Sequence, residues 1–188
     1  EKKMMWRAAA RRGMATSARP WKVYLSGEIH SSWRQDIAAG IRERELPVTL
    51  SGPNPSHEDS DDCGAIILGD EATRQNYDNK GARMNLIRTR TLLSEADVVV
   101  VRFGDKYRQW NAAFEAGFAT AIGKPLVTLH PPALEHPLKE VNAGALAVCH
   151  DVQQVVDILD YTLTGNLPPP KDDGFTPMQE RLAKPPAS

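Results

Sequence analysis

Four consecutive valines at residues 98–101 constrain the fold of this chain more than any other feature of its sequence. A run of β-branched residues without alternating polar positions is typical of a strand buried on both faces, as strands are in a parallel sheet. A polar loop follows the run, and apolar residues then recur at helical spacing from Trp110 to Ile122. Because parallel strands need crossover connections, which are usually helices, this unit predicts an α/β domain.

The rest of the chain repeats the same alternation of strand and helix. Further short apolar runs predict strands at residues 23–25, 48–50, 125–129 and 145–149. Helical spacing predicts helices that begin near residues 33, 82 and 152. Residues 51–80 are rich in Gly, Pro, Ser, Asn and Asp, so a loop is predicted there. The β–α unit, repeated about five times, predicts a doubly wound parallel sheet.

Apolar spacing also predicts which side chains face the core. Trp33 is expected there, as are the apolar residues of the two helices on either side of the valine run: Met84, Leu86, Ile87, Leu92, Leu93, Trp110, Ala113, Phe114, Gly117, Phe118, Ala121 and Ile122. Glu115 lies off this stripe, in the first turns of its helix, where the helix dipole favours an ionised carboxylate. Ligands of doubly wound sheets bind beyond the carboxyl ends of the strands, so Glu115 is expected to face that crevice. On the residues alone, an ordinary helix-end glutamate is the simpler interpretation.

The two ends of the chain differ in composition from its middle. Residues 1–22 carry seven Lys or Arg and one acid, although the whole chain has a net charge of −1. An Arg- and Ala-rich segment with hydroxyls is typical of a transit peptide, so residues 1–21 are predicted to be a basic targeting arm. The alternative is a solvated basic tail. Six prolines from Pro168 onward predict an extended arm over residues 167–188, which leaves residues 22–166 as the domain.

Missing patterns exclude several classes of protein. No apolar run approaches the ~18 residues of a membrane span, and the small net charge gives no expectation of specific nucleic-acid binding. The sequence has neither a Gly-rich phosphate-binding motif nor histidines at zinc-ligand spacing, so we expect no cofactor and no metal. The basic arm predicts a mitochondrial matrix location, and the protein is otherwise expected in the cytoplasm.

One long segment resembles a known family. Residues 111–125, NAAFEAGFATAIGKP, are similar to the Ala-Phe-Glu-x-Gly…Ala-x-x-Lys-Pro signature of nucleoside 2-deoxyribosyltransferases, and YLSG at 24–27 resembles their first strand and turn. Residues 22–164 as a whole resemble the YtoQ family within that superfamily, in these pieces: VYLSGEIH (23–30), FG (103–104), Tyr107, QWNAAF (109–114) and HPLKEV (136–141). The resemblance implies a flavodoxin-like, five-stranded sheet, usually in a homo-oligomer, and no cofactor.

The resemblance also implies a reaction and its residues. In the transferases the glutamate that matches Glu115 attacks the anomeric carbon of a nucleoside, the base leaves, and a glycosyl-enzyme forms, as in retaining glycosidases. The aspartate of the transferases falls here on residues 88–90, which are Arg-Thr-Arg. Asp105, Glu28 or His30 is therefore expected to act as the acid, with Asp105 in the predicted catalytic pair. The remaining residues predicted to line the substrate site are Tyr24, Gly27, Glu28, His30, Gln109 and Asn111.

Two functional hypotheses follow from these observations. In the first, the protein hydrolyses the N-glycosidic bond of a nucleoside or nucleotide, or transfers its (deoxy)ribosyl group. A phosphate on the substrate would suit the arginines near the crevice: Arg83, Arg88, Arg90 and Arg102. In the second, the protein is a catalytically relaxed accessory subunit of a large mitochondrial assembly, a respiratory complex or mitoribosome, held by its terminal arms.

Overall fold

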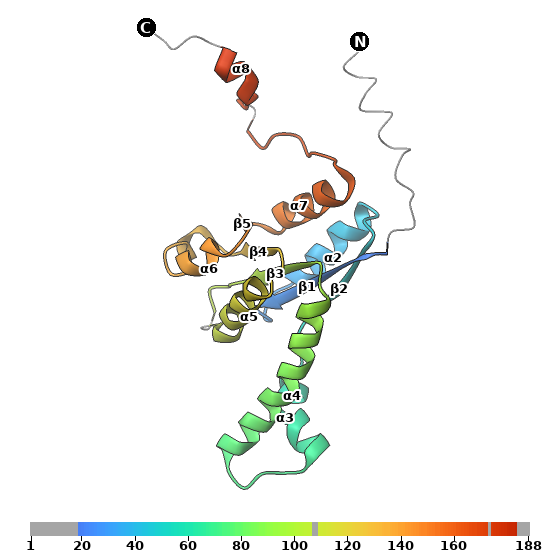
Figure 1. The fold of residues 1–188 in the computed structure, drawn as a ribbon, viewed down its shortest axis with the longest axis vertical. Coiled ribbons are helices and arrows are strands. Elements are labelled where there is room, and N and C mark those ends of the chain that lie inside the picture. Colours follow the sequence, from blue (N-terminus) through green and yellow to red (C-terminus); the bar gives the residue numbers. More distant parts are fainter. Residues whose placement is uncertain (1–18, 107–108, 173, 184–188) are drawn as a thin grey trace.

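The fold is a five-stranded, all-parallel sheet with helices on both faces (Figure 1). The computed structural model describes residues 19–106, 109–172 and 174–183. The strand order is β2-β1-β3-β4-β5, which is the flavodoxin-like order, so the predicted fold class is confirmed. The strands are β1 (Trp21–Gly27), β2 (Val48–Ser51), β3 (Val98–Arg102), β4 (Leu126–Leu129) and β5 (Ala147–Cys149).

Two apolar layers hold the helices on the sheet. Helices α2 (Trp33–Glu43) and α7 (Val152–Thr164) pack on one face, where Trp33 is 1% exposed, as predicted. The C-terminal part of α4 (Arg74–Glu95) and helix α5 (Trp110–Ala121) pack on the other face. All four valines of β3 are buried, and their side chains alternate between the two layers, as the sequence predicts for a central parallel strand.

The loop predicted for residues 51–80 is wrong, because most of this segment is helical. Helix α3 (His57–Leu68) and the first part of α4 form a hairpin that projects from the sheet (Figure 1). Ser56 and Thr73 cap the two helices by accepting hydrogen bonds from backbone N–H groups. A Cβ on Gly64 would lie 2.6 Å from the backbone nitrogen of Gly81, so only glycine permits this packing distance. Because α3 packs mainly on α4 and not on the sheet, its sequence carries a weak apolar pattern.

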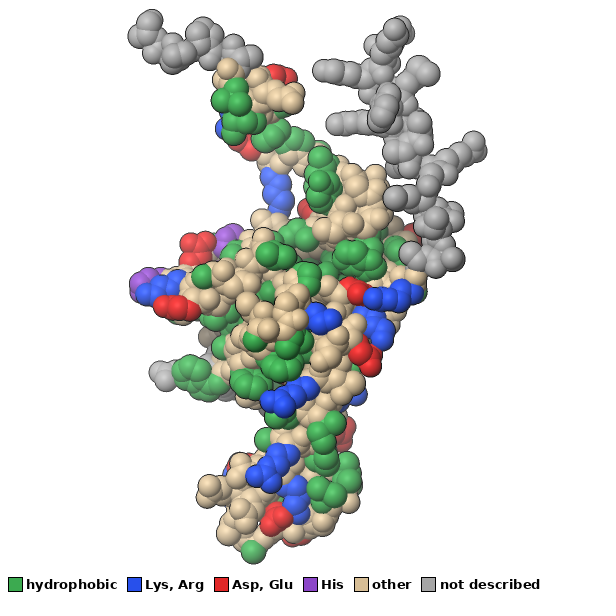
Figure 2. All heavy atoms as spheres, viewed as in Figure 1, with side chains coloured by type: hydrophobic (Ala, Val, Ile, Leu, Met, Phe, Trp, Pro, Cys, Tyr) green, Lys and Arg blue, Asp and Glu red, His purple; other side chains and the backbone are tan. Residues whose placement is uncertain are grey.

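The inward faces predicted for α4 and α5 are also partly wrong. In α4, Leu93 is buried, whereas Ile87 is 61% exposed on the hairpin. Figure 2 shows hydrophobic side chains at the surface of this projecting hairpin. In α5 the buried side chains are those of Ala112, Glu115, Ala116 and Ala119. Trp110 and Phe114 are 70% and 55% exposed. Small residues let α5 lie close to the sheet, and apolar spacing could not identify that face because α5 is apolar on nearly every side.

Short elements complete the chain. A 3-10 turn, η2 (Pro132–Leu134), and helix α6 (Lys139–Ala143) connect β4 to β5. The predicted C-terminal arm contains helix α8 (Met178–Ala183), so it is not extended throughout. Arg19 forms two hydrogen bonds of 2.7 Å with the Asp97 carboxylate, and these join the chain before β1 to the start of β3. Most of the predicted targeting arm lies outside the described residues. Within the described ranges, no helix is both long and apolar enough to cross a membrane.

Candidate active site

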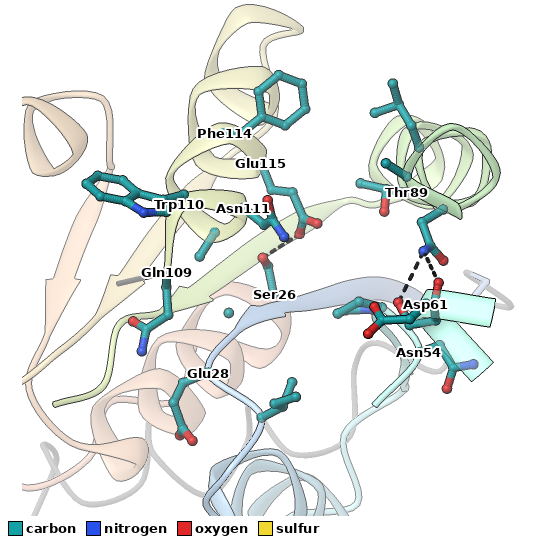
Figure 3. A pocket seen from close by; sticks show the side chains of 18 of the residues that line it. Ser26, Glu28, Asn54, Asp61, Thr89, Gln109, Trp110, Asn111, Phe114 and Glu115 are labelled. Carbon is teal, nitrogen blue, oxygen red and sulfur yellow. Dashed lines mark hydrogen bonds between the residues drawn. The ribbon is translucent and has the colours of Figure 1, made fainter. Parts of the chain in front are cut away.

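A cavity of about 880 Å³ opens beyond the carboxyl ends of β1 and β3 (Figure 3). This is the point where the strand order reverses direction, at which doubly wound sheets bind their ligands. The β1–α2 turn, the α3–α4 hairpin and the first turns of α5 surround it. Its size lies within the range of small-molecule sites, roughly 300–1,000 Å³. The fold therefore places the candidate site where the sequence predicted it.

Glu115 is the carboxylate at the inner end of this cavity. Its side chain is part of the buried face of α5, and the residue is 8% exposed. Tyr24 Oη donates a hydrogen bond of 3.2 Å, and Ser26 Oγ one of 2.5 Å, both to Oε2 of this carboxylate. In the described part of the chain no hydrogen bond reaches Oε1. One carboxylate oxygen is therefore held in place by two hydroxyl groups.

Burial and local polar groups have opposite effects on this carboxylate. Burial raises the pKa of Glu115 above its ordinary value, while the hydrogen bonds from Ser26 and Tyr24 and the charge of Arg34 reduce that increase. Burial and the neighbouring Glu115 charge also raise the pKa of Tyr24, so its hydroxyl stays protonated and acts as a donor. Glu115 thus combines an elevated pKa with partners that favour its ionised form, a combination common in catalytic carboxylates.

The β1–α2 turn forms one side of the cavity. Gly27 has a φ of 106°, and a Cβ there would lie 2.0 Å from the Arg102 carbonyl oxygen, so the turn requires glycine. Glu28 follows, buried, with its carboxylate 3.4 Å from Arg102 Nε. Burial raises the pKa of Glu28, but hydrogen bonds from Ser31 and the His30 backbone and the charge of Arg102 lower it overall. Glu28 therefore remains ionised at neutral pH and holds the turn in shape.

The structure brings most of the predicted site residues together. Gly27, Glu28, His30, Gln109, Asn111 and Glu115 all line the cavity, and Tyr24 lies behind Glu115. Gln109 also shapes the loop after β3, since its side-chain amide bonds to the backbone of Gly104 and Lys106. Asp105 is exposed on that loop and is not among the lining residues.

Sequence reasoning assigned no site role to most of the residues that the β2–α3 loop, α3 and α4 contribute to the cavity. Asn54, Ser60, Asp61, Asn85 and Thr89 line the side of the cavity opposite α5 (Figure 3). Ser60 and Asp61 were missed because residues 51–80 were predicted to be a loop. Asn85 and Thr89 lie on the helix predicted from near residue 82, where apolar spacing does not identify polar side chains that face a cavity. Ser26 lies in a segment that the sequence places at the crevice, but no site role was predicted for its hydroxyl. Of the four arginines considered for phosphate binding, Arg88 lines the cavity.

The described residues contain no cluster of three or more His, Cys, Asp or Glu side chains that could hold a metal ion. The polar groups of the cavity are carboxylates, hydroxyls, amides and a few cationic side chains. Such a set can position a polar ligand, hold an ionised nucleophile and move a proton.

Comparison with known proteins identifies relatives over most of the chain. The family described as nucleoside 2-deoxyribosyltransferase YtoQ matches residues 24–163. The uncharacterized protein YtoQ of Bacillus subtilis (strain 168) is 42% identical over 139 residues, which cover 74% of this chain and 94% of that protein. Among solved structures, a 2-deoxyribosyltransferase from Bacillus psychrosaccharolyticus aligns with a TM-score of 0.48 and 18% identity, over 72% of this chain and 90% of that one.

Proposed function

Because the chain belongs to the YtoQ nucleoside 2-deoxyribosyltransferase family, we propose that it cleaves the N-glycosidic bond of a nucleoside or nucleotide, with Glu115 as the nucleophile. The observation that carries the proposal is the position of the Glu115 carboxylate. It is buried at the inner end of a ligand-sized cavity, and two hydroxyls hold Oε2 while Oε1 has no hydrogen bond from a described residue. A carboxylate fixed in this way can attack without reorganising its surroundings.

The first chemical step forms a glycosyl-enzyme. Glu115 Oε1 attacks the anomeric carbon of the sugar, a new C–O bond forms, and the bond from that carbon to the base nitrogen breaks. The electron pair of the broken bond goes to the base, which takes up a proton as it leaves. The hydrogen bonds from Tyr24 and Ser26 keep the carboxylate oriented while its negative charge is lost to the ester.

The second step regenerates Glu115. In hydrolysis, water attacks the anomeric carbon and gives a proton to the group that protonated the leaving base, while the bond from that carbon to Glu115 breaks, so the free sugar is released and the carboxylate is restored. In transfer, the nitrogen of a second base attacks in the same way, loses its proton to the same group and forms a new nucleoside. Both outcomes use the same glycosyl-enzyme and retain the configuration of the sugar, because two displacements occur at one carbon.

The leaving base needs a proton donor on the other side of the cavity. Glu28 lines the cavity but is kept ionised by Arg102 and by hydrogen bonds, which makes it a poor acid. Asp61 lines the wall contributed by α3, opposite Glu115 (Figure 3). We assign the proton transfer to Asp61, and variants of Asp61 and of Asp105 separate this assignment from the one predicted from sequence.

Trp110 and Phe114 suit the recognition of a base at the entrance of the cavity. Both line the cavity, and both keep a large exposed fraction despite their apolar rings. Aromatic rings can stack on any nucleobase, because every base has a π face. Arg88, on the opposite wall, is available to a phosphate group, so nucleoside 5′-monophosphates belong among the substrates to be tested.

The experiment combines a substrate panel with a trapping step. Purified protein is incubated with ribo- and deoxyribonucleosides and their 5′-monophosphates, and release of the free base is followed by chromatography. A nucleoside with fluorine at the sugar 2′ position slows the second step, so the intact mass should increase by one glycosyl group located on the Glu115 peptide. Glu115→Gln should neither release base nor gain mass, and exposed Glu140→Gln should behave as wild type. Absence of base release from the whole panel would overturn the proposal.

A further inference from the structure

Arg34 occupies an unusual position behind the site. It lies in the first turn of α2, and its guanidinium turns back to the end of β1. Nε donates to the Leu25 carbonyl at 3.2 Å, Nη2 to the Gly27 carbonyl at 3.0 Å, and Nη1 to the Glu28 carbonyl at 2.7 Å. The group also lies over the Trp33 ring, 4.6 Å from its centroid.

These contacts fix the backbone that carries the two hydroxyl partners of Glu115. Strand β1 ends at Gly27, where carbonyl groups lose their partners in the sheet and must find other donors. The planar guanidinium provides several donors in a fixed arrangement, which a lysine ammonium does not. Tyr24 and Ser26 alternate with the carbonyls that Arg34 binds. A shift of this segment would therefore move both hydroxyls relative to the Glu115 carboxylate.

No carboxylate accepts a hydrogen bond from Arg34 within the described ranges, although the charge of Glu28 acts on it, as does that of Glu115. The hydrogen bonds of Arg34 all go to carbonyl groups, and within the described ranges it forms no ion pair. The half-buried cation therefore acts on nearby anions, and its charge opposes the effect of burial on the pKa of Glu115. Other charged or titratable side chains face the cavity from neighbouring elements: Glu28, His30, Asp61, Asp78, Arg88 and Lys106.

We infer that Arg34 is a positioning residue for Glu115, because its guanidinium holds the end of β1, and with it the Tyr24 and Ser26 hydroxyls, in place. Its positive charge adds a smaller effect, on the ionisation of Glu115. The catalytic part of this inference rests on the proposed function, whereas the effect on ionisation does not. Two properties of one side chain are therefore separable by substitution. Arg34→Lys keeps the charge and loses the planar donor set, and Arg34→Met loses both.

The test measures ionisation and turnover separately. Protein with ¹³C-labelled glutamate carboxyls is titrated by NMR, and the Glu115 signal is assigned by its loss in Glu115→Gln. We expect Glu115 to titrate at a higher pH in Arg34→Met than in wild type. In Arg34→Lys, Glu115 should titrate near its wild-type pH. The acid limb of the kcat/KM profile should move in the same way. Both variants should lose kcat, by up to ~100-fold, because the hydroxyls are displaced.

Arg44 provides the matched control. It also lies at an end of α2 and is half-buried, but it pairs with Asp157 and Asp160 of α7, away from the cavity. Arg44→Met should lower stability and leave the titration of Glu115 unchanged.

If Glu115 titrates in Arg34→Met at the same pH as in wild type, the role of the charge is overturned. If Arg34→Lys keeps the full wild-type kcat, the role of the planar donor set is overturned. If Arg34→Met does not fold, Arg34→Lys still decides the second point. If wild type cleaves no nucleoside, the proposed function fails, and the NMR titration still decides the first.

Discussion

Ser26 Oγ and the Glu115 carboxylate lie 2.5 Å apart, although 89 positions separate the two residues in the chain. The parallel sheet explains this proximity. Strand β1, which carries Ser26, pairs with β3, and α5 follows β3 and packs back on the sheet. The Glu115 carboxylate and the hydroxyls that orient it thus come from two neighbouring β–α units, and their contact depends on the pairing of β1 with β3.

Glu115→Gln is expected to raise the stability of the folded protein at neutral pH. Burial raises the pKa of Glu115 in the folded state, so the native protein binds this proton more tightly than the unfolded chain does. The free energy of unfolding of wild type should therefore fall relative to that of the variant as pH rises. The fall begins near the pKa of Glu115 in the unfolded chain and is complete above its pKa in the folded protein. Urea denaturation of both proteins across this pH range measures the difference. A variant that is less stable than wild type at neutral pH would contradict the prediction.

Ser26→Ala should reduce turnover without unfolding the protein. The lost hydrogen bond is made to a charged acceptor and is worth ~1.5–3 kcal/mol, which corresponds to about 10- to 100-fold in rate if it acts fully in the transition state. Base release by wild type and variant, at saturating nucleoside, measures the effect. Ser32→Ala is the control, since Ser32 Oγ bonds to Asp36 on the exposed side of α2. Equal losses in both variants would show that the Ser26 contact has no special role.

Gly27→Ala should destabilise the fold more than Gly69→Ala does. Both glycines have positive φ values, 106° and 93°, so both substitutions carry a conformational cost of ~1–3 kcal/mol. At Gly69 nothing lies within 4 Å of the added Cβ, whereas at Gly27 the added Cβ meets the Arg102 carbonyl oxygen. Urea denaturation separates the two costs. Equal destabilisation would mean that the β1–α2 turn can move away from β3.

The sheet and the place of Glu115 beside the crevice could be predicted from sequence because both depend on local signals, whereas the catalytic role of Glu115 was implied by the family resemblance and stays a prediction. The valine run identifies a buried parallel strand, and Glu115 follows it at the start of a helix. The α3–α4 hairpin could not be predicted in this way. Its helices are stabilised by caps and by the contact between Gly64 and Gly81, which joins residues that are not neighbours in sequence.

The proposed proton donor illustrates the same limit. Asp61 belongs to an acidic run that is typical of a solvated loop, and only the fold of the hairpin places it on the cavity wall. Asp105, in the loop between β3 and α5, was predicted as the acid with Glu28 and His30 as alternatives, and the sequence does not decide among the three. The expected homo-oligomer stays a prediction, and so does the mitochondrial location, since residues 1–18 lie outside the described residues.

A nucleoside whose base leaves without taking up a proton distinguishes the role of the proton donor from that of the nucleophile. An N7-methylated purine carries a positive charge in the nucleoside, so it departs as a neutral base and needs no acid. Glu115→Gln should lose cleavage of this nucleoside and of the unmethylated one by several orders of magnitude, because both need the nucleophile. Removal of the acid should affect only the unmethylated substrate.

We expect Asp61→Asn to show this selective loss. Cleavage of the unmethylated nucleoside should fall by ~10²–10⁴-fold, the usual contribution of general acid catalysis, and cleavage of the methylated nucleoside should stay near the wild-type rate. Asp105→Asn should retain both activities, because Asp61 lines the cavity and Asp105 does not. Initial rates of base release for the two substrates provide the measurement. If Asp105→Asn shows the selective loss instead, Asp105, in the loop after β3, is the acid. Equal losses on both substrates in Asp61→Asn would show that Asp61 binds the substrate without protonating it.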